Sequence, residues 1–172
     1  MLITRADING NLGQGYLMAI AVDPLASRLM LIGIYTNLVF ANGSSLAVRN
    51  EAIYNINSNT WAGASLGTAQ PSAVAYGPGG TFYMADSTND RVWRLDPYNQ
   101  TTWTQIGVFA KCTPTCSGAF VGTMIGDSAQ LYVGGTFNNV QGANWASPDS
   151  GYGLSRKSPD LRELLDEVAA QV

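Results

Sequence analysis

Two carboxylates and an arginine lie close together in the middle of the sequence, at Asp86, Asp90 and Arg91. Two carboxyl groups about 5 to 9 Å apart can supply the acid and the base of a carbohydrate-active hydrolase or lyase. The structural alternative is that both aspartates accept hydrogen bonds from backbone amides of a turn, while Arg91 pairs with one of them. A short separation within one loop matches a catalytic pair only loosely. The pattern therefore favours the structural role and a chain that is not an enzyme.

The composition removes several other kinds of chemistry. The 172 residues contain no histidine, so the commonest general base near neutral pH and the commonest metal ligand are missing. Cys112 and Cys116 enclose a short loop with a proline, a spacing that favours a local disulfide over two free thiols. A zinc site would need further ligands, and neither cysteine nor histidine remains to supply them. We therefore expect neither a metal nor a cofactor.

Charge and hydropathy narrow the choice of partners. Nine basic residues stand against twelve acidic ones, and the formal net charge of −3 leaves no cationic surface for nucleic acid or anionic lipid. No segment approaches the roughly 18 to 20 apolar residues that span a bilayer, so we expect no membrane insertion. No secretory signal is visible at the N-terminus. An oxidised cysteine pair would nevertheless indicate an extracellular or surface location.

Aromatic and amide side chains supply the candidates for binding. An exposed ring at Trp145 could stack on a sugar or on a partner protein, although docking on its own domain is the structural alternative. The Asn-rich stretches 37–45 and 138–144 offer amide donors and acceptors for carbohydrate or peptide. Asparagine also populates turns because it tolerates positive φ. The candidate amides are Asn138, Asn139 and Asn144.

The elements that must position these residues come from a sequence that repeats about every 50 residues. Each copy begins with a run of small and apolar residues, followed by a turn and a second apolar run; two copies add a third and a fourth. The best alignment places Gly33, Ala85 and Gly134 at one position, with spacings of 52 and 49 residues. Asp23 and Asp127 then follow the first run of their copies, where we expect them to start turns. Short β-branched and aromatic runs between turn residues predict four antiparallel strands per copy.

A lone sheet of four strands cannot bury both of its faces, so such units stack face to face around an axis as propeller blades. The sequence therefore predicts an all-β fold, a propeller-like stack of four-stranded antiparallel sheets within residues 1–145. Trp61 and Trp103 recur at the repeat spacing, and we expect both to pack between blades. The predicted blades are about 16–67, 68–107 and, in part, 118–140.

Several of these residues resemble known propeller repeats. The Gly134-Gly135 doublet and the segments 53–61 and 95–103, which end on Asn-Thr-Trp and Thr-Thr-Trp, look like parts of the kelch-type repeat. The stretch 83–92, with its Ala-Asp-x-x-Asn-x-Arg-Val pattern, is similar to NHL-like blades. The resemblance covers about residues 16–145 and implies about two and a half blades. It implies no particular activity, because such propellers include binding scaffolds, structural proteins and enzymes.

A different kind of sequence follows the third copy. Residues 146–157 are rich in Gly, Ser and Pro and predict a linker. Ser158, Pro159 and Asp160 then provide a helix start, which predicts an amphipathic helix over 158–172. This helix either attaches the chain to a partner or folds back on its own sheet. Its apolar face consists of Leu161, Leu164, Leu165, Val168 and Val172.

The expected function follows from the number of predicted blades, which is too small to close a propeller ring. About four to eight blades close a propeller, and the uncovered sheets at either end of a shorter stack must be protected. We therefore expect a non-enzymatic structural or recognition module of a larger assembly, with protein partners that include its own copies or neighbouring chains, and with carbohydrate as a further candidate ligand. The alternatives are a carbohydrate-active hydrolase or lyase that uses the loop carboxylates, and a fragment of a larger surface propeller.

Overall fold

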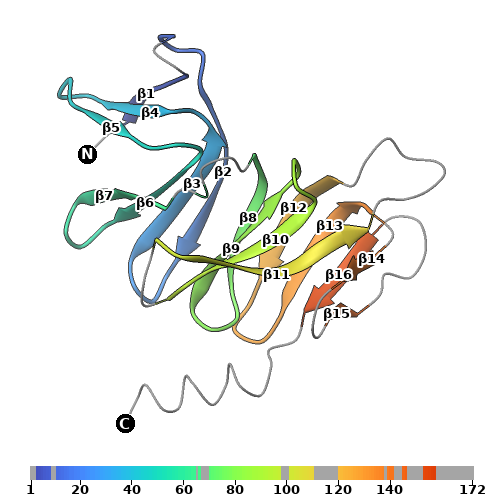
Figure 1. Cartoon of the computed structure of the whole chain (residues 1–172). Helices are drawn as coiled ribbons and strands as arrows, with labels where there is room; N and C mark the ends of the chain where they lie inside the picture. The colour runs from blue at the N-terminus through green and yellow to red at the C-terminus, as the bar shows by residue number, and fades with distance from the viewer. Residues whose placement is uncertain are drawn as a thin grey trace.

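The computed structural model describes residues 3–8, 11–64, 66, 70–97, 101–110, 120–137, 139–141, 145–146 and 153–157. These residues form strands in four antiparallel sheets, and no helix occurs among them. The predicted all-β fold is therefore confirmed. Three larger sheets stand side by side, with a small sheet at the N-terminal end (Figure 1). The predicted helix 158–172 lies outside the described residues.

The first two sheets follow the predicted repeat. In both sheets, each of the four strands pairs with the next strand of its repeat copy. In the first sheet, a further hairpin is inserted between the second and the third of these strands. The first sheet consists of β2 (Tyr16–Asp23), β3 (Arg28–Ile34), β6 (Glu51–Asn55) and β7 (Thr60–Gly63). The second consists of β8 (Pro71–Gly77), β9 (Thr81–Asp86), β10 (Arg91–Leu95) and β11 (Trp103–Ala110), with β14 (Asn139–Gln141) added beside β11.

The third sheet corrects the prediction for the end of the repeat. It has four strands rather than two, in the order β12 (Phe120–Gly126), β13 (Leu131–Thr136), β16 (Gly153–Lys157) and β15 (Trp145–Ala146). The prediction of a linker over 146–157 is wrong for 153–157, which pairs with β13 from Leu131 to Gly135. The open edge of β13 supplies backbone partners, so a segment of weak strand propensity still forms a strand there.

A small fourth sheet was not predicted. It consists of β1 (Ile3–Asp7), β4 (Asn37–Phe40) and β5 (Ser45–Ala47), in the order β1-β4-β5. The β4–β5 hairpin is inserted between β3 and β6, and it occupies most of the Asn-rich stretch 37–45 that we expected to be an exposed loop. Residues 3–7 therefore belong to this sheet and not to a repeat. We call β1, β4 and β5 the side sheet.

The repeat is marked in the structure by an irregularity near the start of each first strand. The pairing shifts between Leu17 and Ala19, between Pro71 and Ala73, and between Val121 and Thr123. The residues opposite the start of each shift are Gly33, Asp86 and Gly135. The predicted alignment of Gly33 with Ala85 and Gly134 is therefore wrong by one residue, and this matters because successive residues of a strand point to opposite faces.

Each large sheet has two distinct faces, which we name by the direction of the stack. The forward face of a sheet packs against the next sheet along the chain, and the rear face packs against the preceding one. Between the first and second sheets, a core forms from Ala21, Met30, Ile32, Ile53, Val74, Phe82, Met84 and Leu95. Between the second and third sheets, the equivalent core includes Ala73, Ala75, Tyr83, Ala85, Val121, Met124, Leu131 and Val133.

The same rule governs both cores. Across both interfaces a forward face with small side chains in its first strand, Ala21 or Ala75, shares a core with a rear face whose first strand has a larger side chain, Val74 or Met124. Strand β8 consequently lies between β2 and β12. The backbones of β8 and β12 approach each other closely where β12 ends. A Cβ atom on Gly126 would lie only 2.2 Å from the Tyr76 carbonyl oxygen. Only glycine fits that approach. The three sheets do not close a ring within the described residues.

Candidate functional site

Asp86, the first of the candidate acids, is fully buried at the end of β9. Its Oδ1 accepts hydrogen bonds from the backbone amides of Thr88 at 3.0 Å, Asn89 at 3.3 Å and Gln70 at 3.3 Å. Its Oδ2 accepts another from the Asn89 side chain at 2.6 Å. The predicted turn-fixing role of Asp86 is confirmed by these bonds. A buried carboxylate that already accepts from four donors is poorly placed to exchange protons with a glycan.

Asp90 and Arg91 continue the same turn. Asp90 has a positive φ of 53° at the last position before β10, a conformation that Asp adopts more readily than most residues. Arg91 is exposed and lies opposite Asp86 in the β9–β10 register. Its guanidinium carbon lies 5.7 Å from the centroid of the Trp93 ring. Asp86, Asp90 and Arg91 thus lie together at the turn between β9 and β10. The Arg91 side chain stacks on the Trp93 ring.

Asp23 and Asp127 start turns, as predicted. Asp23 Oδ1 accepts from the amides of Leu25 and Ala26, both at 3.0 Å, and Asp127 Oδ1 accepts from those of Ala129 and Gln130, both at 2.7 Å. These bonds are the side-chain-to-backbone contacts that close a hairpin turn locally.

The first of these turns also contains a buried ion pair. Arg28 Nε donates to Asp23 Oδ2 at 2.8 Å, and a second guanidinium nitrogen contacts the same oxygen. Arg28 extends over the ring of Phe82 in the second sheet, with 5.6 Å between its guanidinium carbon and the ring centroid. The pair therefore ties the first sheet to the second.

Trp103 packs between two repeated sheets, as predicted, whereas Trp61 packs against the side sheet and not against another repeated sheet. Trp103 of the second sheet lies against the core shared with the first sheet, and its Nε1 donates to the Ala64 carbonyl oxygen. Trp61 of the first sheet lies against the side sheet, with 5.9 Å between its ring centroid and that of Phe40. The side sheet thus occupies, for the outer strands of the first sheet, the place that a preceding sheet would take.

A deeply buried tyrosine lies beneath the side sheet. Tyr35 is fully buried, and its hydroxyl donates to the Leu31 carbonyl oxygen at 3.1 Å. Burial, with a smaller contribution from the carboxylate of Glu51, raises the pKa of the Tyr35 hydroxyl above its ordinary value. The hydroxyl therefore stays protonated, and it acts as a structural donor.

Several predicted site residues lie outside what the structure describes. Trp145 belongs to β15 and Asn139 to β14, but their side chains are not described, so their binding roles stay predictions. The remaining candidates lie wholly outside the described residues, as do both cysteines and the apolar face of the predicted helix. These are Asn138, Asn144, Cys112, Cys116, Leu161, Leu164, Leu165, Val168 and Val172.

The surface that sequence reasoning missed is the rear face of the first sheet. Ile20 and Val22 of β2 are 57% and 53% exposed, whereas Val74 and Met124, which occupy the Ile20 position in the other two sheets, are 7% and 6% exposed. Leu29 lies beside Val22 on the same face and is half-buried. The alternation of alanine with larger residues in 19–22 is the signal that could have revealed this face, because it gives the strand one face of small side chains and one face of large apolar side chains.

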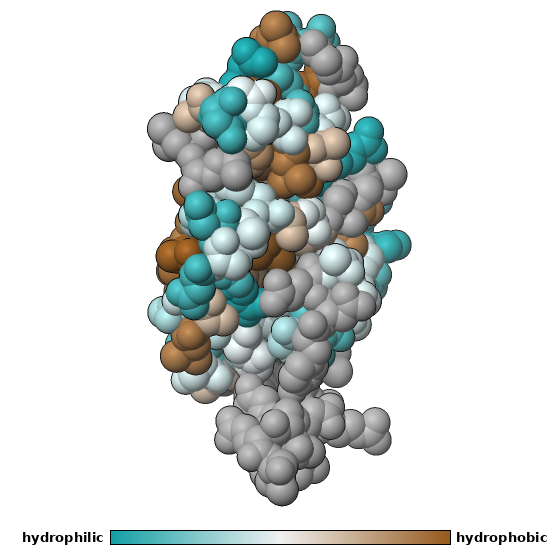
Figure 2. All heavy atoms as spheres, turned by 90° about the vertical axis from the view of Figure 1, so that its left-hand side faces the viewer, coloured by the Kyte–Doolittle hydropathy of each residue, from teal (hydrophilic) through white to brown (hydrophobic). Residues whose placement is uncertain are grey.

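The side sheet covers only part of this rear face. Its core of Ala6, Tyr35, Leu38, Phe40 and Val48 packs on Ala52 and Trp61, which belong to the outer strands β6 and β7. On the inner strands, Ile20 and Val22 of β2 stay exposed, whereas Leu31 of β3, which lies opposite Ile20, is buried. Figure 2 looks at the molecule from this side, where apolar groups reach the surface between polar ones.

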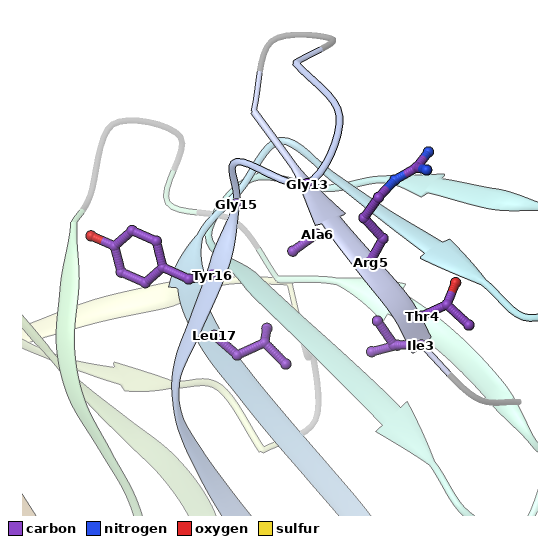
Figure 3. A pocket seen from close by; sticks show the side chains of 8 residues that line it. All are labelled: Ile3, Thr4, Arg5, Ala6, Gly13, Gly15, Tyr16 and Leu17. Carbon is purple, nitrogen blue, oxygen red and sulfur yellow. The ribbon is translucent and has the colours of Figure 1, made fainter.

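An open pocket of about 500 Å³ adjoins the uncovered strand, between β1 and β2. In Figure 3 the side chains of Ile3, Ala6 and Leu17 point into it, whereas Tyr16 points away on the other side of β2. The pocket extends the apolar rear face toward the side sheet. The described residues of its lining also include the polar side chains of Thr4 and Arg5.

The forward face of the third sheet also has an exposed apolar side chain among the described residues. Ile125 is 67% exposed at the position that Ala21 and Ala75 take in the other forward faces. Its cross-strand neighbour Tyr132 is half-buried, and Thr123 on the same face is exposed. The stack thus ends on one rear face and one forward face, both with exposed apolar side chains.

In the part of the chain that the structure describes, no group of three or more acidic, histidine or cysteine side chains is placed to hold a metal ion, and no helix is long and apolar enough to cross a membrane. No protein-family model matches the chain, and no curated protein sequence matches it significantly. The resemblance to kelch-type and NHL-like repeats therefore stays a prediction.

Proposed function

We propose that this chain is a non-enzymatic structural module, a propeller-like stack that takes part in an assembly by binding protein through its two end faces. One observation carries the proposal: Ile20 is 57% exposed on the rear face of the first sheet, at the position where Val74 and Met124 are buried in the other sheets, and Val22 beside it on the same face is 53% exposed. Contiguous exposed apolar side chains on a sheet usually mark an interaction surface.

The free energy available at this face is substantial. Full burial of a Val or Ile side chain contributes about 1.5 to 3 kcal/mol relative to full exposure, and roughly half of that remains available for Ile20 and Val22. Ile125 on the forward face of the third sheet adds a similar amount. If the chain is a fragment of a larger surface propeller, further sheets of the longer chain would cover the same two faces.

The contacts of the loop acids support a non-enzymatic role over a hydrolase or lyase. Asp86 is buried and bonded to its own turn, and Arg91 stacks on Trp93. A carboxylate that shapes a turn is needed for stability, and its replacement by asparagine would change folding before it changed any turnover.

A site-specific cross-linking experiment tests the proposal. A photoreactive phenylalanine analogue is placed at Val22 in the full chain, in the cells that produce the protein, and a second chain carries it at Ser45, which is exposed on the side sheet. We expect one adduct of defined mass from position 22 and none from position 45. The adduct should disappear when Ile20→Asp is added, because a charge in the contact cannot be desolvated cheaply. Adducts of equal yield from both positions, or none from position 22, contradict the proposal.

A further inference from the structure

We propose that the rear face of the first sheet in one copy packs against the forward face of the third sheet in a second copy, and that two copies form one closed ring of six sheets. The inference rests on the proposed function and adds the identity of the partner. It follows from the rule by which the three sheets already pack on one another.

The first step is the complementarity of the two free faces. Within the chain, every covered rear face receives a forward face: Val74 meets Ala21, and Met124 meets Ala75. The faces left over are one rear face, around Ile20, and one forward face, around Ile125. A contact between these two continues the existing packing, whereas a contact between two rear faces does not.

The second step is the volume of the side chains. On the forward face of the third sheet, Ile125 is larger than the alanines of the other forward faces, which are Ala21 and Ala75. Gly134, in contrast, is smaller than Ala85 and Ile32, the residues at its own position. The larger side chain at Ile125 is thus offset by the missing side chain at Gly134 on the neighbouring strand. A packed interface tolerates substitutions that conserve the total side-chain volume.

The side sheet must also fit into the proposed dimer without blocking the contact between the two end faces. Sheets that radiate from an axis diverge toward the periphery, so their inner strands meet while their outer strands separate. The side sheet packs at the outer strands β6 and β7, around Trp61, and leaves the inner strand β2 free. It therefore fills the space that opens between two diverging sheets and does not block contact at Ile20.

The fourth step is closure. Head-to-tail contacts generate either a ring or an open filament, depending on the rotation between copies. The described residues of one copy provide three large sheets, fewer than the roughly four to eight that close around an axis, and those of two copies provide six. A dimer then contains two identical interfaces and leaves no apolar end face exposed.

Complementation between two variants tests this inference. Ile20→Asp damages only the rear face and Ile125→Asp only the forward face, and both side chains are exposed in a single copy, so each variant should fold. We expect light scattering to give the mass of two chains for the wild type and of one chain for each variant, with dimer affinity reduced at least about 100-fold. An equimolar mixture should regain a two-chain species, because one intact rear face then meets one intact forward face. The control Ile56→Asp, an equal change at an exposed turn, should leave the dimer intact.

The outcomes separate this inference from the proposed function. If Ile20→Asp abolishes the dimer while Ile125→Asp does not, two rear faces meet each other, and the inference fails although the rear face remains a protein-binding surface. A mass that keeps rising above two chains contradicts closure. A wild type that stays at the mass of one chain overturns the inference, and the cross-linking at Val22 then decides the proposed function by itself.

Discussion

The rear faces of the first and second sheets have similar side chains but differ in whether another sheet covers them. Both have a large apolar residue two positions past the pairing shift, Ile20 in the first sheet and Val74 in the second, on a strand with alanines on its other face. Val74 is buried against the first sheet, whereas Ile20 is 57% exposed. The difference teaches that burial in this molecule is a property of the stack, because a single sheet cannot cover its own faces.

The largest expected effect that tests this comparison is at Phe82 and Leu29, which occupy the same position of the repeat. Phe82 is fully buried, so Phe82→Ala should lower the free energy of unfolding by about 3–5 kcal/mol through lost burial and a residual cavity. Leu29→Ala on the half-open face should cost less than about 2 kcal/mol. Urea denaturation at low protein concentration measures both. Equal losses would mean that the first rear face is covered within a single copy.

A second prediction concerns the close approach of the sheets at Gly126. A Cβ there would lie 2.2 Å from the Tyr76 carbonyl oxygen and 2.7 Å from Gly77 Cα, so Gly126→Ala must push the second and third sheets apart. We expect a loss of about 1–3 kcal/mol in the free energy of unfolding. Gly122→Ala on the same strand meets only the mobile end of the Phe120 side chain, at 3.2 Å, and should be nearly neutral. Thermal unfolding measures both variants under the same conditions. Equal shifts of the unfolding midpoint for Gly126→Ala and Gly122→Ala would contradict this account.

The smallest effect compares the two repeated tryptophans. Trp103→Phe removes the hydrogen bond to Ala64, whereas the buried Nε1 of Trp61 finds no acceptor in the described part of the chain. Loss of a hydrogen bond costs about 0.5–1.5 kcal/mol, while removal of a buried donor without a partner relieves a desolvation penalty. Trp103→Phe should therefore destabilise the protein by about 1 kcal/mol more than Trp61→Phe in guanidinium denaturation. The reverse order would indicate that the side sheet holds Trp61 more firmly than the first sheet holds Trp103.

The one-residue error in the repeat alignment shows where sequence reasoning failed. Apolar runs and glycines locate the strands, and an alignment on Gly33, Ala85 and Gly134 is accurate to within one residue. A strand repeats every two residues, so an error of one exchanges the forward and rear faces. The extra residue at each pairing shift has no side-chain signature of its own, so the sequence does not show where the shift falls.

Contacts between distant segments account for the other failures. Strand β14 leaves the third copy to pair with β11 of the second sheet, and β16 then returns to pair with β13. The side sheet likewise joins β1 to a hairpin that starts at Asn37. The partners of these strands lie far away in the chain, and strand propensity alone does not reveal them.

The sequence by itself determined the features that depend on neighbouring residues: the short strands, the turns started by Asp23, Asp86 and Asp127, and the repeat that makes similar sheets. These follow from local hydrogen bonds and from the alternation of side chains along a strand. Only the tertiary structure decided which faces are buried and which strands complete the third sheet. Both depend on what lies beside a strand in space, and a strand carries the same residues whether or not a neighbour covers them.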